Sequence, residues 1–317
     1  MFRPVVERQT IHANVIQQIG TSRSYGAKPR RTIDSYKHCI PTGFFCAAQQ
    51  SSQDNKRFWT CYEEKPTRRV CLWWICADSF SEMKSMAFVE VSDINKVYQP
   101  DGAGSEVRVV SGVSLEIGEG EFVCLMGPSG SGKSTLLTIV GAMNHPSAGS
   151  VSIDGIDVYR LSEERRADFR REYLGFVFQQ HHLMPYLNTI ENVMLPFAAS
   201  PGSARQKRER AMTALESVGL ADKSSRLPNQ LSGGEQGRLA IARAIVNQAP
   251  LILADEPTGT LDTQTGSEIM EVFLSLNRLG QTIFMVTHNP ENAKLADRTV
   301  HMLDGRLICG TAEERTM

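Results

Sequence analysis

The stretch Gly127-Pro128-Ser129-Gly130-Ser131-Gly132-Lys133-Ser134 decides the fold. Its spacing is that of a phosphate-binding loop, in which glycines let backbone N–H groups approach a phosphate closely. A lysine in this place supplies positive charge to the phosphates, and the serine after it supplies a hydroxyl to Mg²⁺. A surface turn rich in Gly and Ser is the alternative. The apolar run at residues 121–126, which leads into the loop as a strand would, disfavours that alternative.

The sequence around this loop predicts strands that alternate with helices. Apolar runs typical of strands buried on both faces of a parallel sheet occur at residues 121–126, 251–254 and 282–286. Residues 88–97 and 107–117 alternate apolar and polar side chains as half-buried strands do, with a loop expected at 100–104. Helices are expected from near Lys133, after a cap at Ser162, and over 205–218 and 266–279. This order predicts an α/β fold with a mixed or largely parallel central sheet and a helical part at about 160–230.

Composition divides the chain into two dissimilar parts. Residues 1–85 carry 13 Lys/Arg against 7 Asp/Glu, which leaves 21 basic and 28 acidic residues in the remainder. The net charge of −7 beyond residue 85 argues against a nucleic-acid face, so no nucleic acid is expected as a partner. The longest apolar run, at residues 70–77, is far shorter than the roughly 20 residues that cross a bilayer, which predicts a soluble or peripheral protein.

The first 85 residues show no convincing helix or strand pattern, and their cysteine spacings fit no zinc site. We expect a poorly structured extension here. Two explanations stay open: a disordered segment, or upstream sequence translated from a misassigned start codon, which we favour because ordered sequence begins after Met86. The domain that carries the loop is then expected at residues 86–317, and deletion of residues 1–85 is expected to leave its activity intact.

Two carboxylates follow the strand expected at 251–254. A carboxylate at the C-terminal end of such a strand can reach a Mg²⁺ beside the phosphate loop, and Asp255 is placed for that role. Glu256 is then the candidate that polarises an attacking water. An acidic strand end before a turn would suit Pro257 equally well, but the phosphate loop favours the functional interpretation.

A second anion-binding element is predicted where Leu231-Ser232-Gly233-Gly234-Glu235-Gln236 opens a helix. One phosphate loop needs no second cradle, so this one is expected to serve the nucleotide of another copy. Here the chain resembles the ATP-binding-cassette (ABC) ATPases, whose signature is this sequence. The resemblance covers roughly residues 87–310 and implies a P-loop NTPase of the ABC type, with an antiparallel β subdomain beside the central sheet and a helical subdomain. It also implies a head-to-tail dimer that encloses two ATP with Mg²⁺.

The family's functional positions can be carried over to this sequence one by one. Lys133, Gln179, Glu256 and His288 are implied as catalytic residues, and Ser134, Gln179 and Asp255 as ligands of Mg²⁺. Residues implied in nucleotide binding are Tyr98, Gly127, Pro128, Ser129, Gly130, Ser131, Gly132, Lys133, Ser134, Thr135, Ser232, Gly233, Gly234, Glu235 and Asp262. Taken alone, Tyr98 could be a packing residue and His288 a structural histidine. Gly237 departs from the family by replacing a longer polar residue, and Thr260 varies a small or polar position.

The sequence near the motifs is similar to that of the lipoprotein-release, macrolide-export and cell-division branch of the ABC ATPases. The stretches that carry this likeness are at residues 107–113, 175–179, 188–193 and 254–259. The likeness implies an integral membrane permease with an extracytoplasmic domain as partner, a second copy of the chain, and a peripheral place on the cytoplasmic face of the inner membrane. A soluble cassette ATPase that acts on a ribosome or DNA is the alternative. A non-hydrolysing cassette is disfavoured because Glu256 and His288 are both present.

Overall fold

The computed structural model describes residues 44–50, 57–63, 87–99, 106–198 and 200–308. Contacts divide the chain into two units, Met1–Glu82 and Met83–Met317, and each is described by itself. This division falls within a few residues of the boundary expected from the sequence. Whether the front segment originates from a misassigned start stays a prediction.

The first unit contains an antiparallel strand pair, β1 (Phe44–Gln50) and β2 (Arg57–Glu63), with Cys46 opposite Cys61 in the register. The expectation of no regular element in residues 1–85 is wrong for these two segments. Both are rich in aromatic residues, which favour strands, although their alternation of apolar and polar residues is irregular. The remaining calls on this segment lie outside the described residues.

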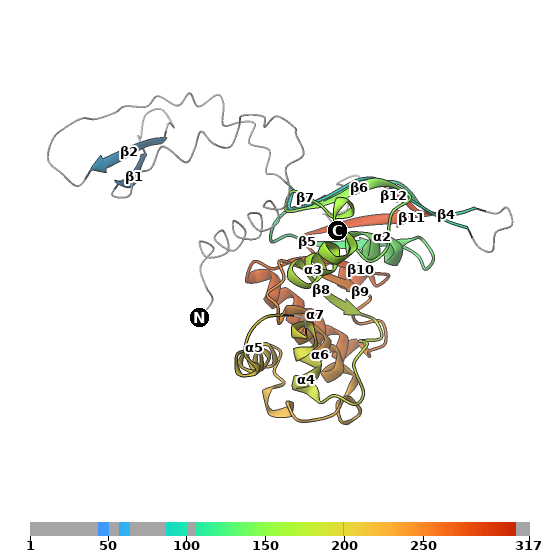
Figure 1. The fold of residues 1–317 in the computed structure, drawn as a ribbon. Coiled ribbons are helices and arrows are strands. Elements are labelled where there is room, and N and C mark those ends of the chain that lie inside the picture. The colour runs from blue at the N-terminus through green and yellow to red at the C-terminus, as the bar shows by residue number, and fades with distance from the viewer. Residues whose placement is uncertain (1–43, 51–56, 64–86, 100–105, 199, 309–317) are drawn as a thin grey trace. The chain divides into compact units, whose positions relative to one another are not determined.

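The second unit is built around a six-stranded sheet in the order β12-β11-β5-β10-β9-β8 (Figure 1). All neighbours pair in parallel except β12, which is antiparallel to β11. The strands are β5 (Phe122–Met126), β8 (Leu174–Phe178), β9 (Leu251–Asp255), β10 (Thr282–Thr287), β11 (Arg298–Leu303) and β12 (Arg306–Ile308). The predicted mixed central sheet is confirmed, and the strands expected at residues 121, 251 and 282 begin within one residue of these positions.

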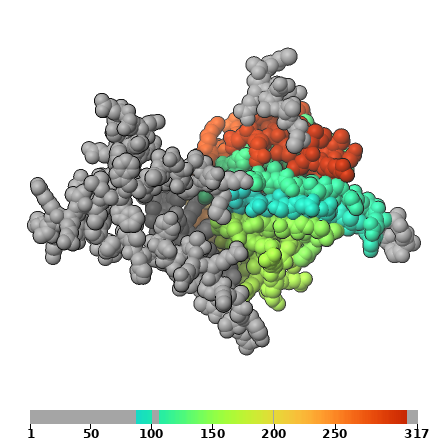
Figure 2. Space-filling model, turned by 90° about the horizontal axis from the view of Figure 1, so that it is seen from above, coloured from blue at the N-terminus to red at the C-terminus, as the bar shows by residue number. Residues whose placement is uncertain are grey.

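A second sheet of four antiparallel strands has the order β4-β3-β6-β7. Its strands are β3 (Val89–Tyr98), β4 (Val107–Ile117), β6 (Ala148–Ile153) and β7 (Ile156–Asp157). Figure 2 shows β3 and β4, in cyan and blue-green, lying between the C-terminal strands in red and the segment around β6 in yellow-green. The predicted antiparallel β subdomain is thereby confirmed. The loop expected at residues 100–104 lies outside the described residues.

Helices connect and cover the strands (Figure 1). They are α2 (Lys133–Val140), α3 (Glu163–Tyr173), α4 (Thr189–Met194), α5 (Ala204–Ser217), α6 (Gly233–Ile245), α7 (Thr263–Arg278) and α8 (Pro290–Ala293). Single 3-10 turns lie at Val158–Arg160, Leu195–Phe197, Ala221–Lys223 and Pro228–Gln230. Among the described residues, no helix combines the length and apolar character that crossing a bilayer requires.

The helical part is smaller and differently bounded than the sequence indicated. The range 160–230 also contains β8, whose five residues pair with β9 in the central sheet. Helix α3 packs its Phe169 and Tyr173 into the core beneath the antiparallel sheet, whereas α4 and α5 pack with α6, which begins after residue 230. The predicted range of 160–230 was therefore wrong at its start, where α3 belongs to the other core, and at its end, which leaves out α6. Apolar patterns alone do not show which core a short element joins.

Two hydrophobic cores lie on opposite faces of the central sheet. Alternate residues of one strand divide between them, so that Leu251 and Leu253 enter one core while Ile252 and Ala254 enter the other. A side chain buried fully in this way stabilises the fold by about 1.5–3 kcal/mol. Burial on both faces explains the unbroken apolar runs and fixes the C-terminal ends of these strands, where the site lies.

Candidate active site

The parallel strands bring the predicted motifs to one edge of the sheet. Met126, which precedes the phosphate loop, is level with Thr287, which precedes His288. Asp255 is level with Val286 of β10 and with Phe178, which precedes Gln179. Segments that are up to about 160 residues apart in the sequence thus meet at the carboxyl end of the sheet, where ligands bind in open α/β sheets.

The phosphate loop presents a buried ammonium group and free polar atoms. Lys133 is only 5% exposed, and its Nζ donates to the carbonyl oxygens of Gly127 and Pro128 at 2.8 Å each. The buried Ser131 Oγ has no hydrogen-bond partner among the described residues. Gly132, with φ of 100°, precedes α2 and provides no side-chain cap. The loop therefore keeps its positive charge and its first-turn amides for a ligand.

A tight backbone contact fixes the shape of this loop. A Cβ at Gly127 would stand 2.1 Å from the carbonyl oxygen of Met302, and one at Gly132 would stand 2.5 Å from that of Val109. The Gly305 N–H donates to the Ser131 carbonyl at 3.0 Å from the turn between β11 and β12. These contacts explain why two of its glycines are needed, and they show that the C-terminal hairpin supports the loop.

The groups placed for Mg²⁺ fit a hydrated cation. Ser134 Oγ donates to Asp255 Oδ1 at 3.0 Å, so a hydroxyl and a carboxylate already converge. Burial raises the pKa of Asp255 above its ordinary value, and the neighbouring Glu256 carboxylate acts in the same direction. A cation between Ser134 and Asp255 would offset that cost, and such oxygen ligands are those that Mg²⁺ prefers.

Glu256 and His288 form a pair at the same edge. His288 Nδ1 lies 2.8 Å from Glu256 Oε2, and the imidazole is 60% exposed while the carboxylate is 19% exposed. The Glu256 backbone has φ of 44°, in the left-handed region, and its N–H donates to the Val286 carbonyl at 2.9 Å. An uncommon backbone conformation of this kind persists where surrounding contacts impose it, and it is frequent at functional sites. Here it presents the carboxylate toward the imidazole.

Gln179 directly follows β8 and packs against Gly259, the last residue of a stretch that carries the family likeness. A Cβ at Gly259 would stand 2.8 Å from Gln179 Nε2, so the absence of a side chain at Gly259 allows the approach. The position of Gly259, shortly after the carboxylate pair, was the available signal. The chain therefore places Gln179 beside the segment that follows Glu256.

The signature segment opens α6 with a reciprocal cap. Ser232 Oγ accepts from the Glu235 N–H at 3.3 Å, and Glu235 Oε2 accepts from the Ser232 N–H at 2.9 Å. The Lys223 ammonium binds the other oxygen of the Glu235 carboxylate and holds its pKa below the ordinary value. Lys223 was missed because it is distant in the sequence. Within the described residues, no hydrogen bond or ion pair joins residues 232–235 to residues 127–135.

Asp262 caps helix α7, on which the signature segment packs. Its Oδ1 accepts from the Thr265 N–H at 3.0 Å, so it caps α7, and its Oδ2 accepts from the Thr265 hydroxyl at 2.6 Å. These bonds hold the pKa of Asp262 below its ordinary value. A Cβ at Gly234 would meet Thr265 Cγ2 at 2.3 Å, so the signature packs directly on this cap. Thr265 was missed, although an Asp three residues earlier is the usual sequence signal of a cap.

Tyr98 stands apart from the central sheet at the end of β3. Its side chain is 41% exposed, and its hydroxyl accepts from Asn144 Nδ2 at 2.7 Å. Lys96 Nζ lies 4.8 Å from the ring centroid and also donates to the His145 carbonyl. The ring is therefore held in place while much of its surface stays accessible.

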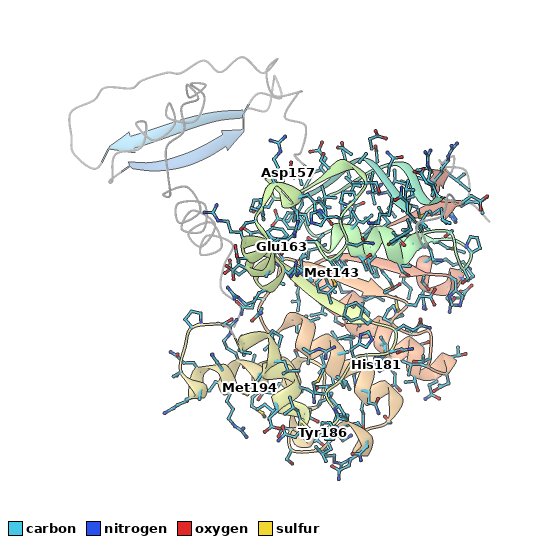
Figure 3. The ribbon with its side chains drawn as sticks, turned by 45° about the vertical axis from the view of Figure 1, so that its right-hand side comes forward. Met143, Asp157, Glu163, His181, Tyr186 and Met194 are labelled. Atoms are coloured by element: carbon cyan, nitrogen blue, oxygen red, sulfur yellow. The ribbon has the colours of Figure 1, made fainter. Side chains whose placement is uncertain are left out.

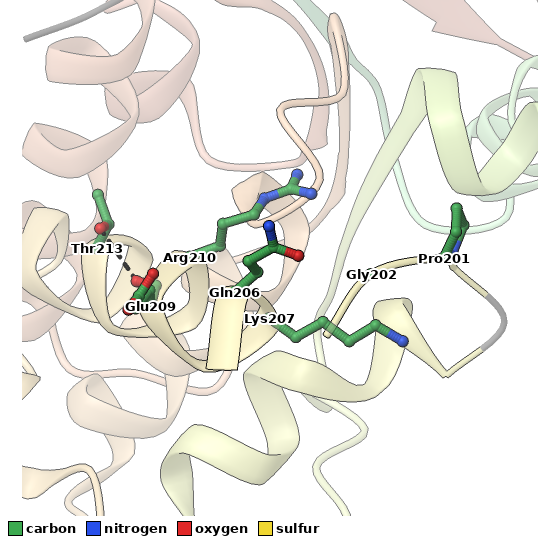
Figure 4. Close-up of a pocket in the computed structure, with 7 residues that line it drawn as sticks. All are labelled: Pro201, Gly202, Gln206, Lys207, Glu209, Arg210 and Thr213. Atoms are coloured by element: carbon green, nitrogen blue, oxygen red, sulfur yellow. Dashed lines mark hydrogen bonds between the residues drawn. The ribbon is translucent and has the colours of Figure 1, made fainter. Parts of the chain in front are cut away.

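A shallow pocket of about 430 Å³ lies elsewhere, on α5 (Figure 4). Lys207 donates to the Phe197 carbonyl and Arg210 to the Val246 carbonyl, while Arg205 pairs with Glu209. Lys207 and Arg210 thus join α5 to neighbouring segments, while Arg205 pairs within the helix, and these contacts favour a structural face. The pocket is lined by Pro201, Gly202, Gln206, Lys207, Glu209, Arg210 and Thr213.

Comparison with known proteins gives one consistent result. The ABC transporter family model matches residues 110–259. The lipoprotein-releasing system ATP-binding protein LolD of Bacteroides thetaiotaomicron is 48% identical over 63% of this chain and 93% of its own length. The macrolide export ATP-binding/permease protein MacB of Chlorobaculum tepidum is 47% identical over 69% of this chain, but the match covers 33% of that longer protein.

A solved structure agrees. The dimeric, post-hydrolysis ATP-binding cassette MJ0796 with ADP and Pi bound is 41% identical, with a TM-score of 0.64 over 69% of this chain and 96% of that chain. The chain therefore belongs to the ABC transporter family as an ATP-binding subunit, and its activity is ATP hydrolysis. The resemblance to the branch that contains LolD and MacB is confirmed.

Proposed function

We propose that this chain is the energising subunit of a membrane export or lipoprotein-release system, and that it works as a head-to-tail dimer around two ATP. The observation that carries the proposal is the separation of two anion-binding elements within one chain. Among the described residues, the phosphate loop holds a buried Lys133 and a Ser131 hydroxyl without a hydrogen-bond partner, while the signature at residues 232–235 makes no bond to the loop. A second copy can supply the missing signature, as the dimeric state of MJ0796 supports.

In this proposal each residue at the sheet edge has a separate task. Lys133 and the amides of residues 127–135 bind the β- and γ-phosphates of ATP. Ser134, Asp255 and Gln179 would hold Mg²⁺, which would supply positive charge against the negative charge that develops on the phosphates. Tyr98 offers its exposed ring to the adenine, and the signature residues with Asp262 belong to the surface that meets the partner's nucleotide.

Glu256 is the proposed base, because its carboxylate lies at the strand end and is held by His288. It orients the attacking water and accepts its proton as the water oxygen bonds to the γ-phosphorus, while the bond from that phosphorus to the β–γ bridging oxygen breaks to leave ADP and inorganic phosphate. Both ring nitrogens of His288 donate in the imidazolium form: Nδ1 lies 2.8 Å from Glu256 Oε2, and we assign the Nε2–H to the γ-phosphate. The strained backbone of Glu256 keeps the carboxylate in this position.

The membrane partner is proposed to be an integral permease with an extracytoplasmic domain, which places this subunit on the cytoplasmic face of the inner membrane. The segment after Gln179 exposes Met184 and Tyr186, the latter 92% exposed, and Figure 3 shows Tyr186 at the outer end of the helical group. The names of the LolD and MacB relatives support this kind of partner.

The test is to isolate the full-length Glu256→Gln variant from membranes with ATP and to identify the protein that comes with it. The variant binds ATP without efficient turnover, so the assembled state should persist. We expect one integral membrane protein in stoichiometric amount, and none when Lys133→Ala is added. Recovery of ribosomes, or of no membrane protein, would overturn the transporter proposal.

A further inference from the structure

One side chain joins the turn after Gln179 to the signature helix. Arg243, near the C-terminal end of α6, donates from Nη2 to the His181 carbonyl at 2.5 Å and from Nη1 to the His182 carbonyl at 2.6 Å. A guanidinium group suits this task because its planar fork presents two donors in fixed directions. Helix α6 thus carries the signature at its first residues, and near its C-terminal end it binds the turn that follows Gln179 through Arg243.

The two carbonyls can face one guanidinium because of an uncommon backbone. His181 has φ of 58° and His182 has φ of 46°, both in the left-handed region that residues with a Cβ seldom adopt. A helical conformation of either hand keeps the carbonyls on the two sides of a residue nearly parallel, as they are along a helix. Such a backbone persists only where other contacts hold it, and charge-assisted hydrogen bonds are among the strongest available.

The His181 imidazole makes a second contact between the same two segments. It is 6% exposed, and its Nδ1 has no hydrogen-bond partner among the described residues (Figure 3). A Cβ at Gly237 of α6 would stand 3.6 Å from the imidazole Cε1 and 3.0 Å from Ile269 Cδ1. The glycine that departs from the family pattern therefore lies where the imidazole and Ile269 pack on the helix.

Movement of His181 must also move Gln179. The His181 N–H donates to the Phe178 carbonyl at 2.9 Å, so a four-residue turn encloses Gln179 between β8 and the Arg243 contact. The side-chain amide of Gln179 also packs so closely on Gly259 that a side chain at residue 259 would not fit. The glutamine therefore has a position that is set from both sides, by the sheet and by α6.

We infer that Arg243 is a positioning residue for ATP hydrolysis: through the carbonyls of His181 and His182 it fixes Gln179 relative to α6, so that the signature and the Gln179 turn move together. The inference rests on the proposed function, because Gln179 matters only if this edge binds Mg²⁺ and ATP. It assigns a role in the reaction to a residue that lies outside the nucleotide-binding motifs.

The test compares full-length Arg243→Lys and Arg243→Met with Arg210→Met. Arg210 is the control because it also donates to a backbone carbonyl, that of Val246, although its side chain on α5 is more exposed than that of Arg243 (Figure 4). We measure turnover, the Mg²⁺ concentration for half-maximal turnover, and ATP affinity without Mg²⁺. Arg243→Met should lower turnover about tenfold and raise the Mg²⁺ midpoint about fivefold, with ATP affinity unchanged. Arg243→Lys should lose less, since an ammonium can still reach one carbonyl.

A double variant separates positioning from loss of stability. If Arg243 acts through Gln179, then Arg243→Met should cost little further turnover once Gln179→Ala is present. Additive losses, a loss equal to that of Arg210→Met, or wild-type turnover in Arg243→Met would each overturn the inference. Failure of the proposed function looks different: wild-type protein would then hydrolyse no ATP, or Glu256→Gln would hydrolyse it normally.

Discussion

The N-termini of helices α2 and α6 differ in whether a side chain caps their free backbone N–H groups. Gly132 precedes α2 without a side-chain cap, and the Ser131 hydroxyl in the adjoining loop has no partner in the part of the chain that the structure describes. Ser232 and Glu235 instead close a reciprocal cap on α6, which Lys223 reinforces. In the proposed dimer, the phosphate loop binds the ATP of its own subunit and keeps its donors open. The signature, which would meet the partner's nucleotide, is instead held in shape by bonds within its own subunit.

The largest effect is expected at the phosphate loop before α2, when the ammonium group of Lys133 is removed. Lys133→Ala should weaken ATP binding by a single subunit about 100-fold, because it deletes the buried charge of the loop. Turnover should fall about 1,000-fold or more. Equilibrium binding of a fluorescent ATP analogue and steady-state ATPase assays measure both effects. The control Lys207→Ala, which removes a lysine from α5, should keep wild-type affinity; equal losses in both variants would contradict the assignment.

The signature should respond in the opposite way to a change at Gly233. This residue is exposed, and an added side chain would press only on the end of Leu261, while a carboxylate at a helix N-terminus favours folding. Gly233→Asp should nevertheless repel the partner's triphosphate and lower turnover about 100-fold. ATP affinity of the single subunit should change by less than about twofold. Affinity that falls together with turnover would place the signature in the same subunit's site.

The support behind the phosphate loop gives a smaller effect. Gly305 has φ of 76°, and a Cβ there would stand 2.6 Å from the Val109 carbonyl oxygen. Gly305→Ala should lower the free energy of unfolding by about 2 kcal/mol and should also weaken ATP binding, because Gly305 holds the Ser131 carbonyl. Urea unfolding and nucleotide titration measure these changes. Gly219→Ala, with φ of 71° and open space around it, should lower stability without changing ATP affinity.

The smallest effect concerns the cap on α6. Lys223→Met should lower the free energy of unfolding by about 1 kcal/mol at pH 7, since Lys223 binds the Glu235 carboxylate. The pKa of Glu235 is lowered in the fold, so this contribution is present above the unfolded value of about 4.3 and is lost as pH falls through the folded value. Urea unfolding at pH 7 and below pH 4 should show the difference between wild type and variant disappearing. A difference that grows in acid would contradict the ion pair.

Local patterns predicted much of this molecule and failed where several segments meet. The apolar run at 251–254 and the two carboxylates after it sufficed to predict a buried strand that ends in carboxylates at the sheet edge, because this pattern depends on neighbouring residues. The contact of Gly259 with Gln179 was missed because it joins segments that are distant in the sequence, whereas the cap contact at Thr265 was missed although its signal, Asp262, is local. Strand β8 was placed in a helical region because its five residues are too few to show a period.

The most direct test of a site shared by two copies is the mass of the full-length Glu256→Gln variant in solution, measured with and without ATP. Analytical ultracentrifugation should show a monomer without nucleotide and a dimer with ATP. Adding Gly233→Asp should keep the protein monomeric while each subunit still binds ATP. A dimer that forms without ATP, or one that persists in the double variant, would contradict the proposal that the signature of one subunit closes the site of the other.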